Sequence, residues 1–277
     1  MNDEILKKMQ KHELKILKEF ARVCELIGVK YYLDGGTMLG AIRHKGFIPW
    51  DDDIDVFMLR EDYEKLLAAA PKHLKKQYFL QTFITDNGYL NNFAKIRDNE
   101  TTFIEKTVKN SDINHGIYID IFPIDNYDIN KKARNFIFNK LINYYILKLY
   151  RNYSVDTKKR KLKKFISLLI PHSKKTNLKT IIKKENIFVK DRKNRCKYLR
   201  NYASVYSLDK AIFKYEWIGN GKLVDFEDMR VYVPENYDMW LKTIYGDYMK
   251  LPPEEKRKPH HDYEKIDFEK SYTEFTK

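Results

Sequence analysis

Cysteine and long apolar runs are scarce in this chain. Its two cysteines, Cys24 and Cys196, cannot build a disulfide framework, so we expect a reducing compartment. No run of about 18 apolar residues occurs, so no membrane-spanning helix is expected. The first residues, Met1-Asn2-Asp3-Glu4, lack the features of a signal peptide. These absences together predict a cytoplasmic protein.

Glycine and proline are also few, at 10 and 8 residues, which argues against a disordered or linker-rich chain. The apolar share of 43% and the aromatic share of 14% suit a folded globule. A chain of 277 residues can bury one large core or two small ones.

Acidic residues are nearly missing from one segment. Residues 129–204 hold 23 Lys and Arg but only 3 Asp and Glu, whereas the rest of the chain holds 30 basic and 36 acidic residues. We therefore expect a basic helical insertion at 129–204, between a first core part at 1–128 and a C-terminal part at 205–277 that completes the core. Its charge predicts an anionic membrane surface as partner, with nucleic acid as the second and a solvated insertion as the third interpretation.

Residue periodicity predicts an α+β protein with a mixed sheet flanked by helices. The expected helices are 3–27, 37–43, 60–70 (ending at Pro71), 133–150, 158–170, 178–191 and 237–245. The expected strands are 29–33, 53–59, 78–83, 93–97, 101–105, 116–122 (ending at Pro123), 211–215, 222–226 and 229–233. The tail from Leu251 reads as a loop.

What the chain has in excess is negative charge between Pro49 and Val56, where Asp51-Asp52-Asp53-Ile54-Asp55 places four carboxylates in five positions. In a strand, Asp51, Asp53 and Asp55 would share one face, and Asp52 the other. Like charges on one ridge repel each other, and a divalent cation such as Mg²⁺ removes that cost. The run therefore predicts a metal-binding strand, in which Asp52 matters least.

The residues upstream of this run suit phosphate binding. Gly35-Gly36 permits close approach of the backbone, and a helix that begins at Thr37 offers free N–H groups to an anion. The basic residues Arg43, His44 and Lys45 follow, and a solvated turn is their alternative interpretation. Phosphate-binding groups beside metal-binding groups predict chemistry on a nucleotide or a phosphodiester.

Other polar residues are candidates for the same site. Lys95 and Arg97 alternate along an expected strand and could both face a nucleotide, or else solvent. His115 could contact a substrate or serve the structure alone, and Asp34 could support the site from behind. His260 and His261 are weaker candidates, because their surroundings read as a tail loop.

Three stretches of the chain resemble the LicD-type phosphocholine transferase family, which is related to the fukutin-related transferases. The first runs from Tyr32 to Val56 and includes Leu33-Asp34-Gly35-Gly36-Thr37 and Pro49-Trp50-Asp51-Asp52-Asp53. The others are residues 115–125, and 231–234 together with 245–249. They span most of the chain outside the basic segment.

The resemblance implies a nucleotidyltransferase fold of the polymerase-β-like kind. It implies Mg²⁺ or Mn²⁺ at Asp53, Asp55 and a third carboxylate, Asp120, and a catalytic group of Asp51, Asp53, Asp55 and Asp120. Gly35, Gly36 and Thr37 match the phosphate-binding turn of that fold, and Asp51 or Asp120 could accept the proton of the acceptor hydroxyl.

The resemblance also implies attack on the distal phosphorus of CDP-choline by a hydroxyl of a cell-surface glycan or teichoic-acid precursor, with release of CMP. CDP-ribitol or CDP-glycerol is the alternative donor, and no aromatic cage for choline can be named from the sequence. A lipid-linked acceptor would place the protein at the inner face of the membrane, held there by residues 129–204. A nucleotide- or RNA-binding protein of the same fold is the second function class, although nucleic acid is the less expected partner.

Overall fold

The computed structural model describes residues 1–89, 91–131, 133, 135–137, 147, 158–169, 196–204 and 206–276. Seven strands within these residues form the main sheet, in the order β1-β2-β6-β4-β3, with β7 beside β6 and β8 beside β7. Only the β2–β6 pair is parallel. The strands are β1 (Tyr32–Leu33), β2 (Asp55–Leu59), β3 (Tyr78–Gln81), β4 (Ala94–Asp98), β6 (Ile117–Tyr127), β7 (Tyr198–Asn201) and β8 (Ile212–Lys214). This mixed sheet with its helices confirms the α+β class.

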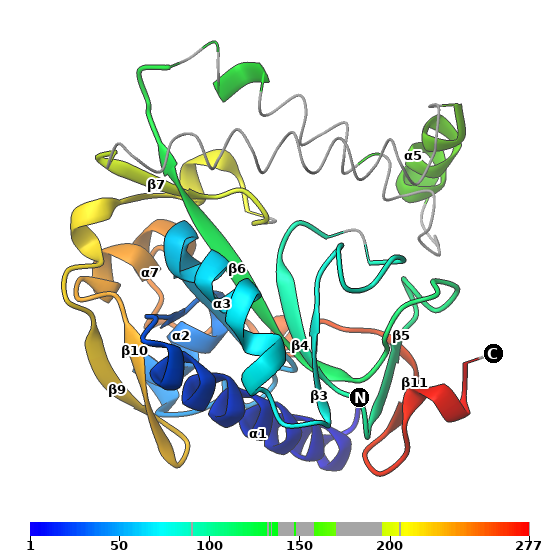
Figure 1. The fold of residues 1–277 in the computed structure, drawn as a ribbon. Helices are drawn as coiled ribbons and strands as arrows, with labels where there is room; N and C mark the ends of the chain where they lie inside the picture. The colour runs from blue at the N-terminus through cyan, green and yellow to red at the C-terminus, as the bar shows by residue number, and fades with distance from the viewer. Residues whose placement is uncertain are drawn as a thin grey trace.

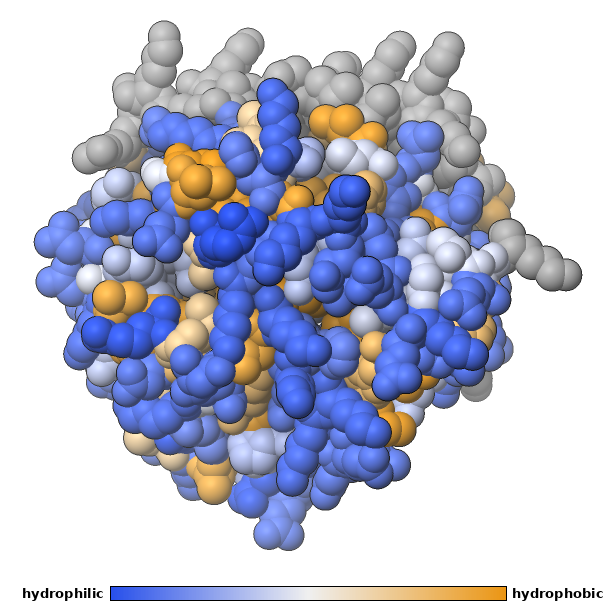
Figure 2. All heavy atoms as spheres, turned by 60° about the horizontal axis from the view of Figure 1, so that its bottom comes forward, coloured by the Kyte–Doolittle hydropathy of each residue, from blue (hydrophilic) through white to orange (hydrophobic). Residues whose placement is uncertain are grey.

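Two helices, α1 (Asp3–Ile27) and α3 (Arg60–His73), pack against the sheet and against each other (Figure 1). The inner face of α1 buries apolar side chains such as Ile16, Leu17 and Phe20 at helical spacing. Asn2 caps the helix, and Gly28, in the left-handed region at φ 67°, ends it as predicted. The outer face of α1 carries exposed lysines, and the side of the molecule seen in Figure 2 is mainly hydrophilic.

Helices α2 (Gly35–His44) and α7 (Tyr237–Tyr245) lie near the hairpin of β9 (Lys222–Phe226) and β10 (Met229–Val233) (Figure 1). Trp240 of α7 is fully buried, and its ring stacks on Phe57 of β2 at 4.7 Å and on Phe213 of β8 at 3.8 Å between ring centroids. This aromatic stack attaches α7 to two strands of the main sheet. A separate pair, β5 (Thr102–Glu105) with β11 (Tyr263–Asp267), ties the C-terminal region to the first half of the chain.

The bounds predicted for β9, β10 and α7 are confirmed residue for residue. Others are wrong for identifiable reasons. The acidic strand begins at Asp55 rather than 53, because Asp51–Ile54 form no ladder. Helix α3 continues past Pro71 to His73, and β6 continues through Pro123 as far as Tyr127, where β7 pairs with it. Strands β7 and β11 were not predicted.

Within the basic segment the structure describes α5 (Lys158–Leu169), which confirms the helix predicted at 158–170. The helices predicted at 133–150 and 178–191 lie largely outside the described residues. Leu162, Phe165 and Leu169 of α5 are exposed. Within the part of the chain that the structure describes, no helix combines the length and apolar character needed to cross a membrane.

Candidate active site

A cavity of about 830 Å³ opens where β2, β6, α2 and α7 meet the C-terminal residues. Its wall combines three kinds of side chain, namely carboxylates, basic groups and aromatic rings. The carboxylates are Asp34, Asp51, Asp53, Asp55 and Asp120. The basic groups include Arg43, Lys250, Lys256 and His261, and the rings include Trp50, Tyr206, Phe213 and Tyr245. All four residues predicted to be catalytic therefore share one cavity.

The parallel register of β2 and β6 places two of these carboxylates together. Asp55 and Asp120 are paired residues on the two strands, and the backbone N–H of Asp120 donates to the carbonyl of Ile54 at 2.9 Å. Lys95 lies opposite Asp120 on the next strand, β4, and its Nζ is 2.6 Å from Asp120 Oδ1. The sheet thus sets a row of Asp55, Asp120 and Lys95, as the alternation of strand side chains requires.

The start of α2 forms the neighbouring wall. Asp34 caps the helix by accepting from the Gly35 N–H at 2.9 Å, and Thr37 Oγ1 accepts from the Asp55 N–H at 2.8 Å. The glycine pair belongs to the first turn of the helix and does not precede it, because the helix begins at Gly35, after its cap Asp34, and not at Thr37. A Cβ on Gly36 would lie 2.6 Å from Asp51 Oδ2, and one on Gly35 3.3 Å from Asp55 Oδ2. The glycines therefore let the carboxylates approach the helix start.

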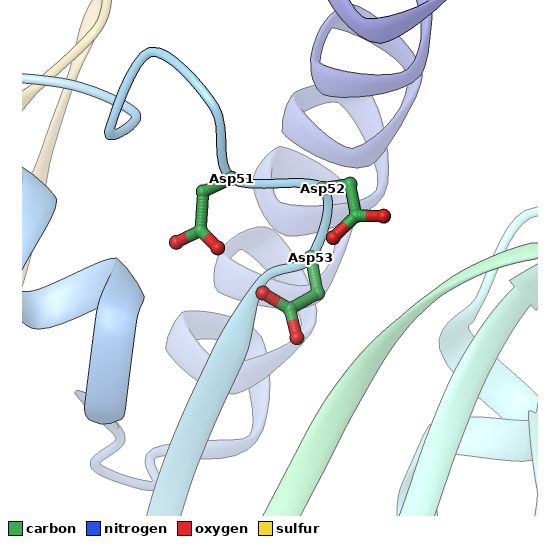
Figure 3. Close-up of side chains that lie close together, drawn as sticks. All are labelled: Asp51, Asp52 and Asp53. Atoms are coloured by element: carbon green, nitrogen blue, oxygen red, sulfur yellow. The ribbon is translucent and has the colours of Figure 1, made fainter. Parts of the chain in front are cut away.

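The side chains of Asp51, Asp52 and Asp53 lie in front of α1, and one carboxylate oxygen of each lies within 4.8 Å of the others (Figure 3). Burial, followed by repulsion from neighbouring carboxylates, raises the pKa of Asp51 and Asp55 well above the ordinary value. The pKa of Asp53 is raised mainly by burial. Such a cluster favours a proton or a cation among its oxygens.

Glu13 of α1 adds a carboxyl group that the sequence reasoning missed. Its side chain is fully buried, and neither carboxyl oxygen has a hydrogen-bond partner within the described part of the chain. Burial, followed by the nearby charges of Asp53, Asp52 and Asp51, raises its pKa well above the ordinary value. Glu13 lies on the apolar stripe of α1, between Met9 and Ile16, so helical spacing is the signal that could have identified it as a buried acid.

Asp52 has a different environment from its two neighbours. Its Oδ1 accepts from the backbone N–H of His260 at 2.9 Å, and its Oδ2 accepts from that of His261 at 3.0 Å. The Nδ1 atom of His261 lies 3.4 Å from Oδ1. Burial raises the pKa of Asp52, but these donors outweigh it and bring the pKa below its ordinary value. Asp52, Asp53 and Glu105 in turn raise the pKa of His261 to about 9 against the effect of burial.

The predicted basic loop contributes one residue to the cavity wall. Arg43 lines the cavity, and its Nη1 donates to the Tyr248 carbonyl at 2.7 Å. His44 packs its ring edge-on against Trp50, with 6.3 Å between ring centroids, and is not part of the wall. Lys45 ends α2 at φ 64° and is exposed, also away from the wall. The chain turns away from the cavity at Lys45, which separates these three neighbours in sequence.

Lys95, Arg97 and His115 were also expected to contact the substrate, and none of them is part of the cavity wall. Arg97 is 1% exposed and donates to Gln81 Oε1 at 2.6 Å and to the Gly116 carbonyl at 2.7 Å. His115 is also buried, and its Nε2 lies 3.1 Å from the Ser111 carbonyl. Arg97 shares a face of β4 with Lys95, but it lies two residues farther along the strand, where its partners are structural.

Comparison with known proteins gives a consistent result. Residues 28–164 match the family model described as LicD/FKTN/FKRP, nucleotidyltransferase domain. The lipopolysaccharide cholinephosphotransferase LicD of Haemophilus influenzae is 33% identical over 266 residues, which covers 90% of this chain and 92% of that protein. The ribitol 5-phosphate transferase FKRP of Mus musculus is 49% identical over 117 residues, covering 40% of this chain and 20% of that protein.

Proposed function

The chain belongs to the LicD/FKTN/FKRP nucleotidyltransferase-domain family and is a phosphotransferase, and from this premise we propose that it transfers phosphocholine from CDP-choline to a hydroxyl of a cell-surface glycan or teichoic-acid precursor, releasing CMP. The observation that carries the proposal is the carboxylate cluster beside the glycine-walled start of α2, inside one cavity. The proposal includes a polymerase-β-like core built from residues 1–128 and 205–277, with a basic insertion at 129–204 whose last residues return to the main sheet as β7.

Asp53, Asp55 and Asp120 would hold Mg²⁺ or Mn²⁺, with Asp51 beside them. Three observations support the fit: the donors are carboxylates, Glu13 is buried next to them without a partner, and a Cβ at Gly36 would fill the space that Asp51 uses. When bound, the cation neutralises negative charge on the phosphates and on the departing CMP.

The chain's own residues would do the following work. Arg43 and the N–H groups at the start of α2 orient the phosphates, and the acceptor oxygen attacks the distal phosphorus in line with the bond to CMP. The P–O bond to CMP breaks, and a carboxylate takes the proton of the hydroxyl. Asp51 suits this role better than Asp120, because Lys95 holds Asp120 at 2.6 Å and the raised pKa of Asp51 favours proton uptake.

The aromatic wall supports choline over an alditol. Tyr206 and Tyr245 pack edge to face, with 6.0 Å between ring centroids and 2.9 Å between hydroxyl oxygens. The charges of Asp34 and other aspartates bear on both rings, which places the pair near the carboxylates. A quaternary ammonium group donates no hydrogen bonds and binds to aromatic faces and negative charge, whereas ribitol or glycerol needs hydrogen-bonding groups around it.

The test is a donor panel with the purified protein, Mg²⁺ and a glycan acceptor, followed by mass spectrometry. CDP-choline is expected to give CMP and a phosphocholine-modified acceptor, faster than CDP-ribitol or CDP-glycerol. The matched control is CDP-3,3-dimethylbutanol, which replaces the ammonium nitrogen by carbon. Its KM should be about fivefold higher, the size of a cation–π contribution. Faster transfer of ribitol phosphate would reassign the donor, and nucleotide addition to RNA from CTP or ATP would favour the second function class.

The basic segment supports a second part of the proposal, that residues 129–204 hold the protein at an anionic membrane surface where a lipid-linked acceptor is presented. Helix α5 exposes Leu162, Phe165 and Leu169 beside basic residues, a pattern typical of interfacial helices. The protein should pellet with anionic vesicles at moderate salt, and a Leu162→Gln, Phe165→Gln variant should pellet less. Absence of pelleting together with tight RNA binding would contradict this part.

A further inference from the structure

The segment that joins α7 to β11 forms one side of the cavity. We call residues 247–262 the C-terminal strap. Its side chains in the wall include Asp247, Tyr248, Lys250, Lys256 and His261. The strap follows Gly246, which ends α7, and it continues into the β11–β5 pair, where the Lys106 N–H donates to the Asp262 carbonyl at 2.9 Å. Both ends of the strap are therefore attached to folded elements.

The strap brings positive charge to a cavity that is otherwise rich in carboxylates. Lys250, Lys256 and His261 all come from it, and Arg43 binds it through the Tyr248 carbonyl at 2.7 Å. The two phosphates of the proposed donor carry one negative charge each, and the aspartates of the site compete with them for the charge of a divalent cation. Cationic hydrogen-bond donors on the facing wall would supply the remainder.

Asp52 fixes the end of the strap nearest to the other aspartates. Its two oxygens accept from the consecutive backbone N–H groups of His260 and His261, at 2.9 and 3.0 Å. The His261 ring packs edge-on against the rings of Phe103 and Tyr118, each with 6.4 Å between centroids, and its Nδ1 faces Asp52. Its Nε2 has no hydrogen-bond partner among the residues that the structure describes.

We propose that His261 binds a phosphate oxygen of the nucleotide through Nε2. Asp52 is then not a metal ligand but the positioning residue that holds His261 in place. The carboxylate of Asp52 is occupied by the strap, whereas those of Asp51 and Asp53 line the cavity. The proposal rests on the proposed function. It assigns separate roles within the Asp51–Asp53 run: Asp53 binds the metal, Asp51 takes the proton, and Asp52 attaches the strap.

The experiment measures CMP affinity by calorimetry in the presence of Mg²⁺. His261→Gln and Asp52→Asn should each weaken CMP binding roughly tenfold, the size of one hydrogen bond to a charged group. The double variant should bind no more weakly than His261→Gln, because Asp52 acts through His261. Mn²⁺ binding without nucleotide should survive in Asp52→Asn and be lost in Asp53→Asn. His73→Gln, at an exposed histidine at the end of α3, is the matched control.

Three results would overturn the proposal: wild-type CMP affinity in His261→Gln, additive losses in the double variant, or loss of Mn²⁺ binding in Asp52→Asn. If Asp52→Asn does not fold, the CMP affinity of His261→Gln decides alone. Inorganic pyrophosphate serves as a second probe. If the wild type does not prefer CMP over AMP, the donor assigned above is wrong, and loss of pyrophosphate binding in His261→Gln would still support the strap.

Discussion

The two ends of the β2–β6 strand pair bury charge in opposite ways. At one end, Asp55 lies beside Asp120 in register, with Asp51, Asp53 and Glu13 nearby. At the other end, Arg60 and Asp125 are 6% and 3% exposed and form a two-pronged ion pair, with Nε–Oδ1 at 2.7 Å and Nη2–Oδ2 at 2.8 Å. One end therefore holds surplus negative charge, and the other holds balanced charge.

This difference distinguishes a structural ion pair from a candidate binding site, and it does not depend on any related protein. A buried ion pair with two matched hydrogen bonds needs no further partner, so the simplest role of Arg60 and Asp125 is to fix α3 to the sheet. Buried carboxylates with raised pKa values remain costly until a cation arrives. The strands are the same, so the unmatched charge at one end supports placing the proposed cation there.

The largest expected effect comes from removing charge at the surplus end. Asp53→Asn and Asp55→Asn should each lower kcat/KM roughly a thousandfold, because the cation loses a ligand. The free energy of unfolding without metal should not fall, because a buried charge has been removed. CMP release and urea unfolding measure the two effects, with the exposed, Lys18-paired Asp228→Asn as control. CMP release at the parental rate would remove these residues from the metal site.

Breaking the balanced end should affect stability and leave activity nearly unchanged. Arg60→Met deprives a buried carboxylate of its ion pair, so the free energy of unfolding should fall by about 3–5 kcal/mol. The double variant Arg60→Met, Asp125→Leu should recover much of the loss. Urea unfolding gives the stabilities, and kcat/KM of the folded fraction should stay within a few-fold of the parent. A loss of activity like that of Asp53→Asn would erase the contrast between the two ends.

A methyl group at the surplus end should also reduce activity. Gly36→Ala places a Cβ only 2.6 Å from Asp51 Oδ2, so Asp51 must shift and kcat/KM should fall about ten- to a hundredfold. Thermal stability should change little, because alanine favours a helix. Gly28→Asn is the control, since a Cβ there meets no atom within 4 Å and asparagine tolerates the left-handed backbone. A parental kcat/KM in Gly36→Ala would show that Asp51 can shift without loss of activity.

The smallest expected effect is a pH dependence confined to the surplus end. Raised pKa values at Asp51, Asp53 and Asp55 mean that the folded state keeps protons that the unfolded state releases above the ordinary pKa of 3.8. Stability without metal should therefore fall as pH rises from 3.8 through the raised values, and Asp34, at about 6, contributes in the lower part of that window. Mg²⁺ at a hundred times its Kd should add about 2.7 kcal/mol, and a fixed Mg²⁺ concentration should add more at higher pH, where ionised carboxylates bind it more tightly.

Thermal unfolding with and without Mg²⁺, at about pH 5 and about pH 8, tests this dependence. The Mg²⁺-induced rise in Tm should be larger at the higher pH and should shrink in Asp53→Asn. An equal rise at both values would show that the carboxylates are ionised throughout.

The sequence was sufficient to identify the end with surplus negative charge, because its residues form local patterns. The run of aspartates, the glycine pair and the alternating apolar residues around Asp120 are each visible within a few positions. Elements with strong local signals, such as β9, β10 and α7, also matched their predicted bounds. Asp52 is a partial success, since it does differ from its neighbours, but because of the strap and not because of strand alternation.

The rest of the site depends on contacts that no local pattern records. Asn201, Tyr206 and His261 read as strand-end or loop residues until the fold brings them to the cavity wall. Strands β7 and β11 were missed for the same reason, because their partners β6 and β5 lie far away in sequence. Arg97 shows the reverse error, where alternation predicted the correct face but not the position along it.

The attachment of the strap can form only late in the synthesis of the chain. The hydrogen bond between Asp52 and the His260 N–H joins residues 208 positions apart. At a ribosomal rate of roughly 5–20 residues per second, about ten to forty seconds separate the emergence of the two partners. Throughout that interval the Asp51–Asp53 run lacks the strap residues that contact it. The contact between Asp52 and the strap can therefore form only after nearly the whole chain has been made.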